Sequence, residues 1–149
     1  MRVIESLLID GQWSAGNHPR RADVFNPASG EVIAQLSLAS STDLDRALAA
    51  AARGFEVWRK TSAYERSKVL RRAADLVRDR ADEIAALITL EQGKPLAEAR
   101  MEAFGAGDHI DWYAEEGRRA YGRVIPPRAS GVRQLVLREP IGPVAAFSP

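Results

Sequence analysis

The chain has 149 residues, with 21 Lys plus Arg, 20 Asp plus Glu and a net charge of +1. That balance gives no electrostatic case for binding nucleic acid. No run approaches the roughly 20 apolar residues of a membrane span, and residues 1–10 do not resemble a signal peptide, so we expect no membrane partner and a cytoplasmic protein. The absence of Cys excludes a disulfide and a thiol nucleophile within these residues.

The first forty residues predict strands. Asp10-Gly11 lies between apolar residues and is typical of a tight hairpin turn. The cluster Asn26-Pro27-Ala28-Ser29-Gly30 is rich in turn residues, and an apolar run follows it from Glu31 to Leu38. This pattern predicts two small hairpins or one antiparallel meander.

The middle of the chain predicts three long helices. The first begins at Ser41 or Thr42, with Thr42 and Asp45 as a capping box. The second begins with the S-x-x-E pattern of Ser62 and ends at Gly93. The third opens at Pro95 and ends at Gly122, and two internal glycines of this helix, Gly105 and Gly107, indicate close packing. A stripe at helical spacing is expected to be the buried face of the first helix: Leu44, Ala47, Leu48, Ala51, Phe55 and Trp58.

The residues that could carry chemistry have plain structural explanations. His18 lies in a polar loop and His109 on the third helix, and neither has a partner at metal-ligand spacing, so no metal site is predicted. Lys94, in "LEQGKP", is explained as a positively charged side chain that stabilises a helix C-terminus. The alternative is a role in ligand binding. Asp111, Glu115 and Glu116 are most simply explained as part of a solvated helix face. No catalytic residue is assigned in this chain.

Several segments, in order along the chain, resemble the N-terminal part of the NAD(P)-dependent aldehyde dehydrogenase superfamily. They are "LLIDGQW", "FNPASGEVIAQL", the helical pair around "EQGKP", "IDWYAEEGRRAYGRVIPP" and "REPIGPVAAFSP". The fourth segment and the Arg-Glu-Pro-Ile-Gly-Pro turn are most similar to the succinate-semialdehyde dehydrogenase branch. The resemblance implies an α/β fold: antiparallel hairpins, three long helices, an arm strand and the first strand of a truncated Rossmann-like sheet.

The resemblance also implies a domain assignment. Residues 1–122 and 140–149 would form the N-terminal part of the cofactor-binding domain, residues 123–139 an arm of the oligomerisation domain, and the catalytic domain would be absent. Phe147, Ser148 and Pro149 match family positions along the NAD or NADP cofactor. Phe104, Gly105 and Asp108 match positions near the mouth of the substrate tunnel. The arm, from Arg123 to Arg138, would pair with another subunit of a homo-oligomer, and its apolar strand edge agrees with that expectation.

The implied reaction oxidises an aldehyde, succinate semialdehyde among the candidates, to its carboxylic acid. A Cys thiolate forms a thioester, NAD or NADP accepts the hydride, and a Glu-activated water releases the acid. The chain contains neither that Cys nor the downstream segments, so these residues alone are expected to be inactive and to bind the cofactor poorly. Two alternatives stay open: a non-catalytic binding module that associates with full-length dehydrogenase subunits, and a free-standing helical domain of unrelated role.

Overall fold

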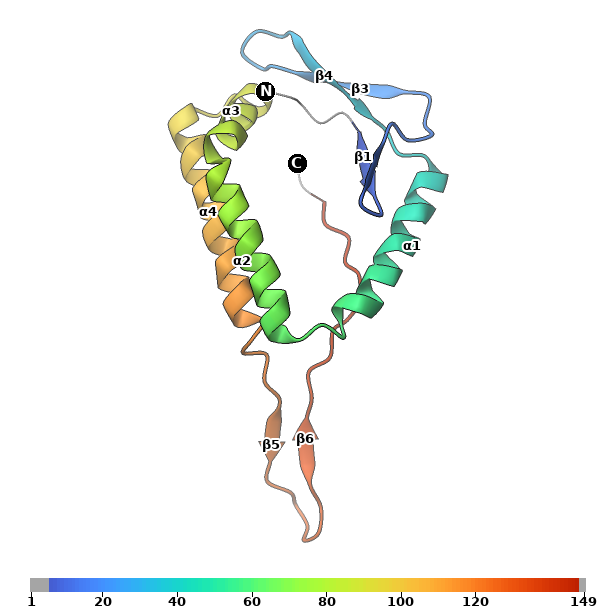
Figure 1. The fold of residues 1–149 in the computed structure, drawn as a ribbon, viewed down its shortest axis with the longest axis vertical. Coiled ribbons are helices and arrows are strands. Elements are labelled where there is room, and N and C mark those ends of the chain that lie inside the picture. The colour runs from blue at the N-terminus through green and yellow to red at the C-terminus, as the bar shows by residue number, and fades with distance from the viewer. Residues whose placement is uncertain (1–5, 148–149) are drawn as a thin grey trace.

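A computed structural model describes residues 6–147, which form two N-terminal hairpins, four helices and a third hairpin (Figure 1). Strands β1 (Leu7–Ile9) and β2 (Gln12–Ser14) pair antiparallel around the Asp10-Gly11 turn. Strands β3 (Arg21–Phe25) and β4 (Val32–Ser37) pair across the turn at residues 26–30, with a register shift between Val24 and Phe25. The two hairpins are separate sheets, so the first of the two predicted arrangements is confirmed.

Four helices follow, where three were predicted. They are α1 (Ser41–Trp58), α2 (Ala63–Asp79), α3 (Ala81–Gln92) and α4 (Leu96–Glu116). The expected second helix breaks at Arg80, whose φ of −108° and ψ of 12° lie outside the helical range. No Gly or Pro marks this break. We attribute it to tertiary packing, because Ala81 and Ala85, just beyond it, are buried. Within residues 6–147, no helix is long and apolar enough to cross a bilayer.

The helix boundaries follow local chemistry in some places and distant contacts in others. Ser62 accepts a hydrogen bond from the backbone N–H of Glu65, as predicted. Gly93 ends α3 with a φ of 74°, a left-handed conformation that glycine adopts without steric cost. Pro95 stands one position before α4, and α4 ends at Glu116 rather than near Gly122.

The capping box of α1 lies two residues earlier than predicted. Ser40, not Thr42, is the N-cap, and its partner is Asp43. The Asp43 carboxylate is fully buried and accepts hydrogen bonds from the backbone N–H (2.8 Å) and the side-chain amide (2.7 Å) of Asn17, as well as from the N–H and hydroxyl of Ser40. The contact with the loop before β3 therefore decides which Ser–Asp pair caps the helix.

Small residues form the core between α4 and the helices packed on it. Both α2 and α3 contact α4, and the residues buried there have no side chain larger than a methyl group or a hydroxymethyl group: Ser67, Ala74, Ala81, Ala85, Ala99, Ala103, Gly107 and Ala114. Three larger apolar residues of α4 are exposed instead: Leu96, Phe104 and Tyr113. Small residues let helix backbones approach closely, which is why the methyl-bearing stripe, rather than the larger side chains, faces the neighbours.

Helix α1 lies apart from that bundle, and its main contact is with β1 (Figure 1). The stripe predicted to be buried is largely uncovered: Leu44 is 58% exposed, Leu48 63% and Trp58 42%. The prediction of a helix with one apolar face is confirmed, but its burial within the described residues is not.

The last part of the chain forms a protruding hairpin and an extended segment. Strands β5 (Arg123–Ile125) and β6 (Gln134–Val136) pair antiparallel at the end of the molecule opposite β3 and β4 (Figure 1). Arg138 donates from Nε to the carbonyl oxygen of Tyr121, 3.1 Å away, and closes the base of the hairpin. The segment beyond it returns between α1 and α2 towards residue 147 (Figure 1).

The hydrogen bonds that Asp43 accepts from Asn17 and Ser40 predict that the stability of the folded chain falls at acidic pH. Hydrogen bonds from the backbone N–H of Asn17, then from the N–H and hydroxyl of Ser40, lower the pKa of Asp43 from 3.8 to about 2, against the opposing effect of burial. Because the folded-state pKa is the lower one, the stabilisation is complete above pH 3.8 and is lost as pH falls through about 2. We expect Asp43→Asn to reduce stability at neutral pH and to remove this part of the acid dependence.

Unfolding in urea, followed by far-ultraviolet circular dichroism across pH, measures this effect. Asp45→Asn is the matched control, because Asp45 is exposed on the same helix. Equal unfolding midpoints for the two variants at every pH would contradict the role given to Asp43.

The two glycines inside α4 give a second prediction. A Cβ at Gly107 would lie 3.1 Å from both Cγ and Nε of Arg78, whereas a Cβ at Gly105 would meet nothing within 4 Å. The prediction of close packing is thus confirmed at Gly107 and wrong at Gly105. Gly105→Ala should stabilise the chain by up to about 1 kcal/mol through helix propensity. Gly107→Ala should stabilise the chain less than this, or destabilise it.

The measurement is the free energy of unfolding of both variants with Arg78 intact and with Arg78→Ala. Once the Arg78 side chain is removed, the two alanine substitutions should have similar effects. A persistent difference between them would show that something other than Arg78 restricts position 107.

Candidate functional site

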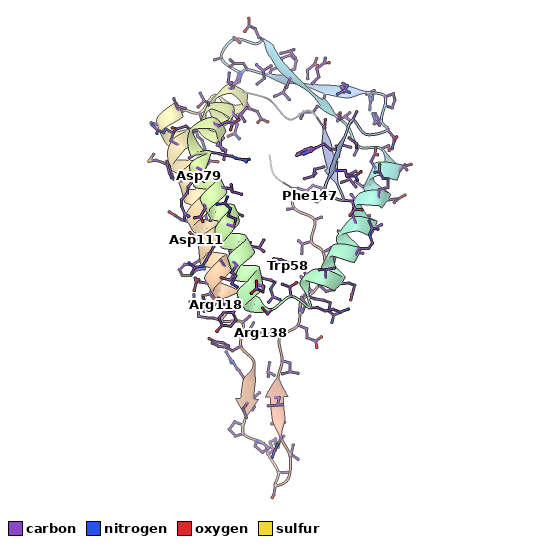
Figure 2. All side chains as sticks on the ribbon, viewed as in Figure 1. Trp58, Asp79, Asp111, Arg118, Arg138 and Phe147 are labelled. Carbon is purple, nitrogen blue, oxygen red and sulfur yellow. The ribbon has the colours of Figure 1, made fainter. Side chains whose placement is uncertain are left out.

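The predicted cofactor residues lie at the end of the described chain. Phe147 is 97% exposed and belongs to an extended segment that forms no strand within residues 6–147 (Figure 2). Ser148 and Pro149 lie outside the described residues. The last segment of the chain, residues 138–149, was expected to provide the first strand of the Rossmann-like sheet. A strand needs a hydrogen-bonding neighbour, and the described part of the chain provides none at this place.

The described residues do not form a dinucleotide site by themselves. A phosphate cradle needs backbone N–H groups at a glycine-bearing turn between a strand and a helix. Within residues 6–147, the one connection from a strand to a helix, residues 38–40 between β4 and α1, contains no glycine. The Phe147 ring offers one apolar wall and no polar group. The residues present therefore fit at most an edge of a cofactor site, and no chemical step can be derived from them.

The three candidates for the substrate tunnel lie on one helix. Phe104, Gly105 and Asp108 all belong to α4, and Phe104 and Asp108 are one turn apart on the same face. Phe104 is 44% exposed, and Asp108 is held by Arg78 of α2. The structure thus brings these residues together on an accessible surface of α4.

Arg78 is the residue that sequence reasoning missed. One of its terminal nitrogens donates to Oδ1 of Asp108 at 2.9 Å and to Oδ2 of Asp111 at 2.6 Å. These two hydrogen bonds, that of Asp108 first, raise the pKa of the Arg78 guanidinium. The side chain passes over Gly107, where a Cβ would crowd it. A glycine in mid-helix was the available signal, because it indicated that something crosses α4 there.

The other candidates have ordinary partners. Lys94 forms an ion pair with Glu102 of α4 and so joins the α3–α4 corner. His18 is half-buried, and its Nδ1 accepts a hydrogen bond from the backbone N–H of Arg20 at 3.1 Å. His109 is exposed. Among residues 6–147, no group of three or more His, Cys, Asp or Glu is placed to hold a metal ion.

Comparison with known proteins places this geometry in a family. The model of the aldehyde dehydrogenase family matches residues 13–149. The chain is 53% identical to the 4-(hydroxymethyl)benzenesulfonate dehydrogenase TsaD1 of Comamonas testosteroni, over 96% of this chain and 30% of that protein. It is 40% identical to the NADP(+) succinate-semialdehyde dehydrogenase GabD of Escherichia coli K12, over 97% of this chain and 30% of that one.

A solved structure agrees with the sequence matches. The crystal structure of succinate-semialdehyde dehydrogenase from Burkholderia pseudomallei superposes with a TM-score of 0.89 at 39% identity, over 93% of this chain and 29% of that chain. The hairpins and helices described above are thus the N-terminal part of that fold, and the chain spans about 30% of the length of the curated relatives it matches. The family match covers nearly all of the chain, which therefore belongs to the aldehyde dehydrogenase family.

Proposed function

We propose that this chain is the N-terminal part of an NAD(P)-dependent dehydrogenase that oxidises an aldehyde to its carboxylic acid. The observation that carries the proposal is the family match over residues 13–149, made by a chain that spans about 30% of its relatives. The two relatives named above act on compounds that carry a sulfonate or a carboxylate. An aldehyde with a second, anionic group is therefore the proposed substrate class, with succinate semialdehyde as one member.

The proposed reaction passes through a thioester on a Cys. Since the chain contains no Cys, the nucleophile has to come from residues outside these 149, and the chain alone is proposed to be inactive. Within the whole enzyme, residues 1–122 and 140–149 would belong to the cofactor-binding domain and residues 123–139 to the oligomerisation domain. Phe147, Ser148 and Pro149 would lie along the cofactor, and Phe104, Gly105 and Asp108 near the entry of the substrate.

The proposal is tested on the protein as its source produces it. With an affinity tag before Met1, we expect an intact mass several-fold above 16.3 kDa and reduction of NAD or NADP with succinate semialdehyde. The purified 149-residue chain, assayed beside it, should reduce neither cofactor. Turnover by that chain would contradict the need for a Cys. A source mass of 16.3 kDa together with a co-purifying dehydrogenase would favour the binding module instead.

The arm supports a proposal about assembly. Val124 and Leu135 face each other across the β5–β6 pair, and they are 83% and 61% exposed, with Leu137 on the same side at 74%. An exposed strand pair with apolar side chains offers both backbone hydrogen-bonding groups and apolar area to a partner. We propose that residues 123–138 contact another subunit of a homo-oligomer.

Substituting the apolar side of the arm should weaken that assembly. We expect Leu135→Asp to shift the whole enzyme towards smaller species, with a loss of at least about 1 kcal/mol if this residue lies at the centre of the interface. Light scattering with size-exclusion chromatography measures the mass. Gln134→Asp, on the other side of the same strand, is the control. Equal oligomer mass for both variants would argue against the arm as the interface.

A further inference from the structure

Gly105 leaves bare backbone in the middle of α4, on the side that faces away from α2 and α3. It lies two positions from the buried Ala103 and from the buried Gly107, and so on the opposite side of the helix. A Cβ at Gly105 would meet nothing within 4 Å, so packing within the described residues does not require a glycine here. A glycine inside a helix also costs stability relative to alanine. A glycine without a packing role is typical of a place where another molecule approaches the backbone closely.

The side chains on either side of Gly105 are apolar and uncovered. Met101, one turn before it, is 68% exposed, and Trp112, two turns after it, is 63% exposed. At 100° per residue, both lie within about 40° of Gly105 around the helix axis. Helical side chains lean towards the N-terminus of their helix, which brings the indole of Trp112 back towards Gly105. We call Met101, Gly105 and Trp112 the Gly105 patch. A thioether and an indole beside bare backbone suit the flat faces of an aromatic ring.

The charged groups beside the Gly105 patch decide which part of a ligand fits it. Asp108 lies one turn after Gly105, and its carboxylate is held by Arg78 of α2 at 2.9 Å. Arg78 is shared with a second carboxylate, that of Asp111. Arg100, the one Lys or Arg of α4, pairs with α3. An anionic group therefore finds a carboxylate and no free guanidinium of α4 at this place, whereas the uncharged part of a ligand finds apolar contacts.

We propose that the Gly105 patch receives the ring of an aromatic aldehyde, and that Gly105 determines specificity for it. The inference rests on the proposed function, which puts Phe104, Gly105 and Asp108 near the entry of the substrate. It narrows the substrate class to aldehydes that carry a ring between the reacting carbon and the anionic group. The bare backbone leaves room for the ring, Met101 and Trp112 pack on it, and the anionic group lies beyond the patch, away from Asp108. A slender aliphatic chain needs no such room.

A segment of the enzyme outside these 149 residues is the other possible occupant of the patch. The missing Cβ favours the substrate. A protein segment can repack its own side chains around one extra methyl group, whereas a substrate ring has a fixed size, so the room for it has to come from the protein. The two occupants also differ in their response to a larger side chain at Gly105. Such a side chain excludes a substrate ring and leaves the fold intact, but it disturbs a packed segment and lowers stability.

Variants of the whole enzyme, as its source produces it, provide the test. Gly105→Ala and Gly105→Leu are compared with Ala106→Leu, because Ala106 is exposed on the same helix and lies about 100° from Gly105. The substrates are 4-formylbenzenesulfonate, which has a ring, and succinate semialdehyde, which has none. For Gly105→Leu we expect kcat/KM to fall at least about tenfold with the aryl aldehyde, mainly through KM, and to stay nearly unchanged with succinate semialdehyde. Ala106→Leu should change neither.

Gly105→Ala separates exclusion of the ring from damage to the fold. It is expected to stabilise the helix and still to lose part of the activity with the aryl aldehyde, which unfolding cannot explain. Equal losses with both aldehydes, together with a lower melting temperature for Gly105→Leu, would assign the patch to a segment of the enzyme and overturn the inference. Unchanged kcat/KM with the aryl aldehyde would overturn it as well. If Gly105→Leu does not fold, Gly105→Ala carries the comparison with a smaller expected loss.

A binding measurement keeps the inference separate from the proposed function. If the enzyme oxidises neither aldehyde, the proposed function fails, and calorimetric titration with benzenesulfonate tests the patch by itself. Binding to the unsubstituted enzyme that Gly105→Leu abolishes and Ala106→Leu retains would support the patch as a ring site. Equal binding to all three proteins, or binding to none, would overturn it.

Discussion

The close approach of α4 to α2 and α3 is the constraint on which the rest of the structure depends. The residues at this contact are buried alanines with Ser67 and Gly107, so the helix backbones meet with little side-chain bulk between them. Such a contact gains dispersion energy from many short contacts but leaves no room for a larger residue. Polar pairs then lie along its rim: Arg71 with Glu115, Arg78 with Asp108 and Asp111, Lys94 with Glu102, and Arg100 with Asp82.

The β3–β4 hairpin meets this bundle at a close contact with the end of α3. Pro27, in the β3–β4 turn, lies against Gly93 at the end of α3. A Cβ added to Gly93 would be only 3.0 Å from Cγ of Pro27, so α3 and this hairpin touch directly. The first hairpin is joined to α1 instead: β1 packs on this helix, and Arg53 pairs with Asp10 of the β1–β2 turn.

Features with a local cause could be predicted from the sequence, and those with a distant cause could not. The Asp10-Gly11 turn, the Ser62 cap and the Gly93 stop depend on residues within one turn of chain, and all three were predicted. The break at Arg80 and the cap at Ser40 depend on contacts with α4 and Asn17, which the sequence does not display. At the site, Phe104, Gly105 and Asp108 were placed together by resemblance to the family, whereas Arg78, thirty positions earlier than Asp108, carries no motif.

The distribution of exposed apolar groups connects this architecture with the proposed function. Between α2, α3 and α4 small residues pack closely, and ion pairs join the helices around that contact. Exposed apolar side chains remain at the α1 stripe, at the Val124–Leu135 pair of the arm, at residues 144–147, and on α4 itself, where Met101, Trp112 and Tyr113 are uncovered. Each of these places exposes apolar area to water, which is unfavourable unless another surface covers it. In the enzyme proposed above, a continuing sheet would cover residues 144–147 and a neighbouring subunit would cover the arm.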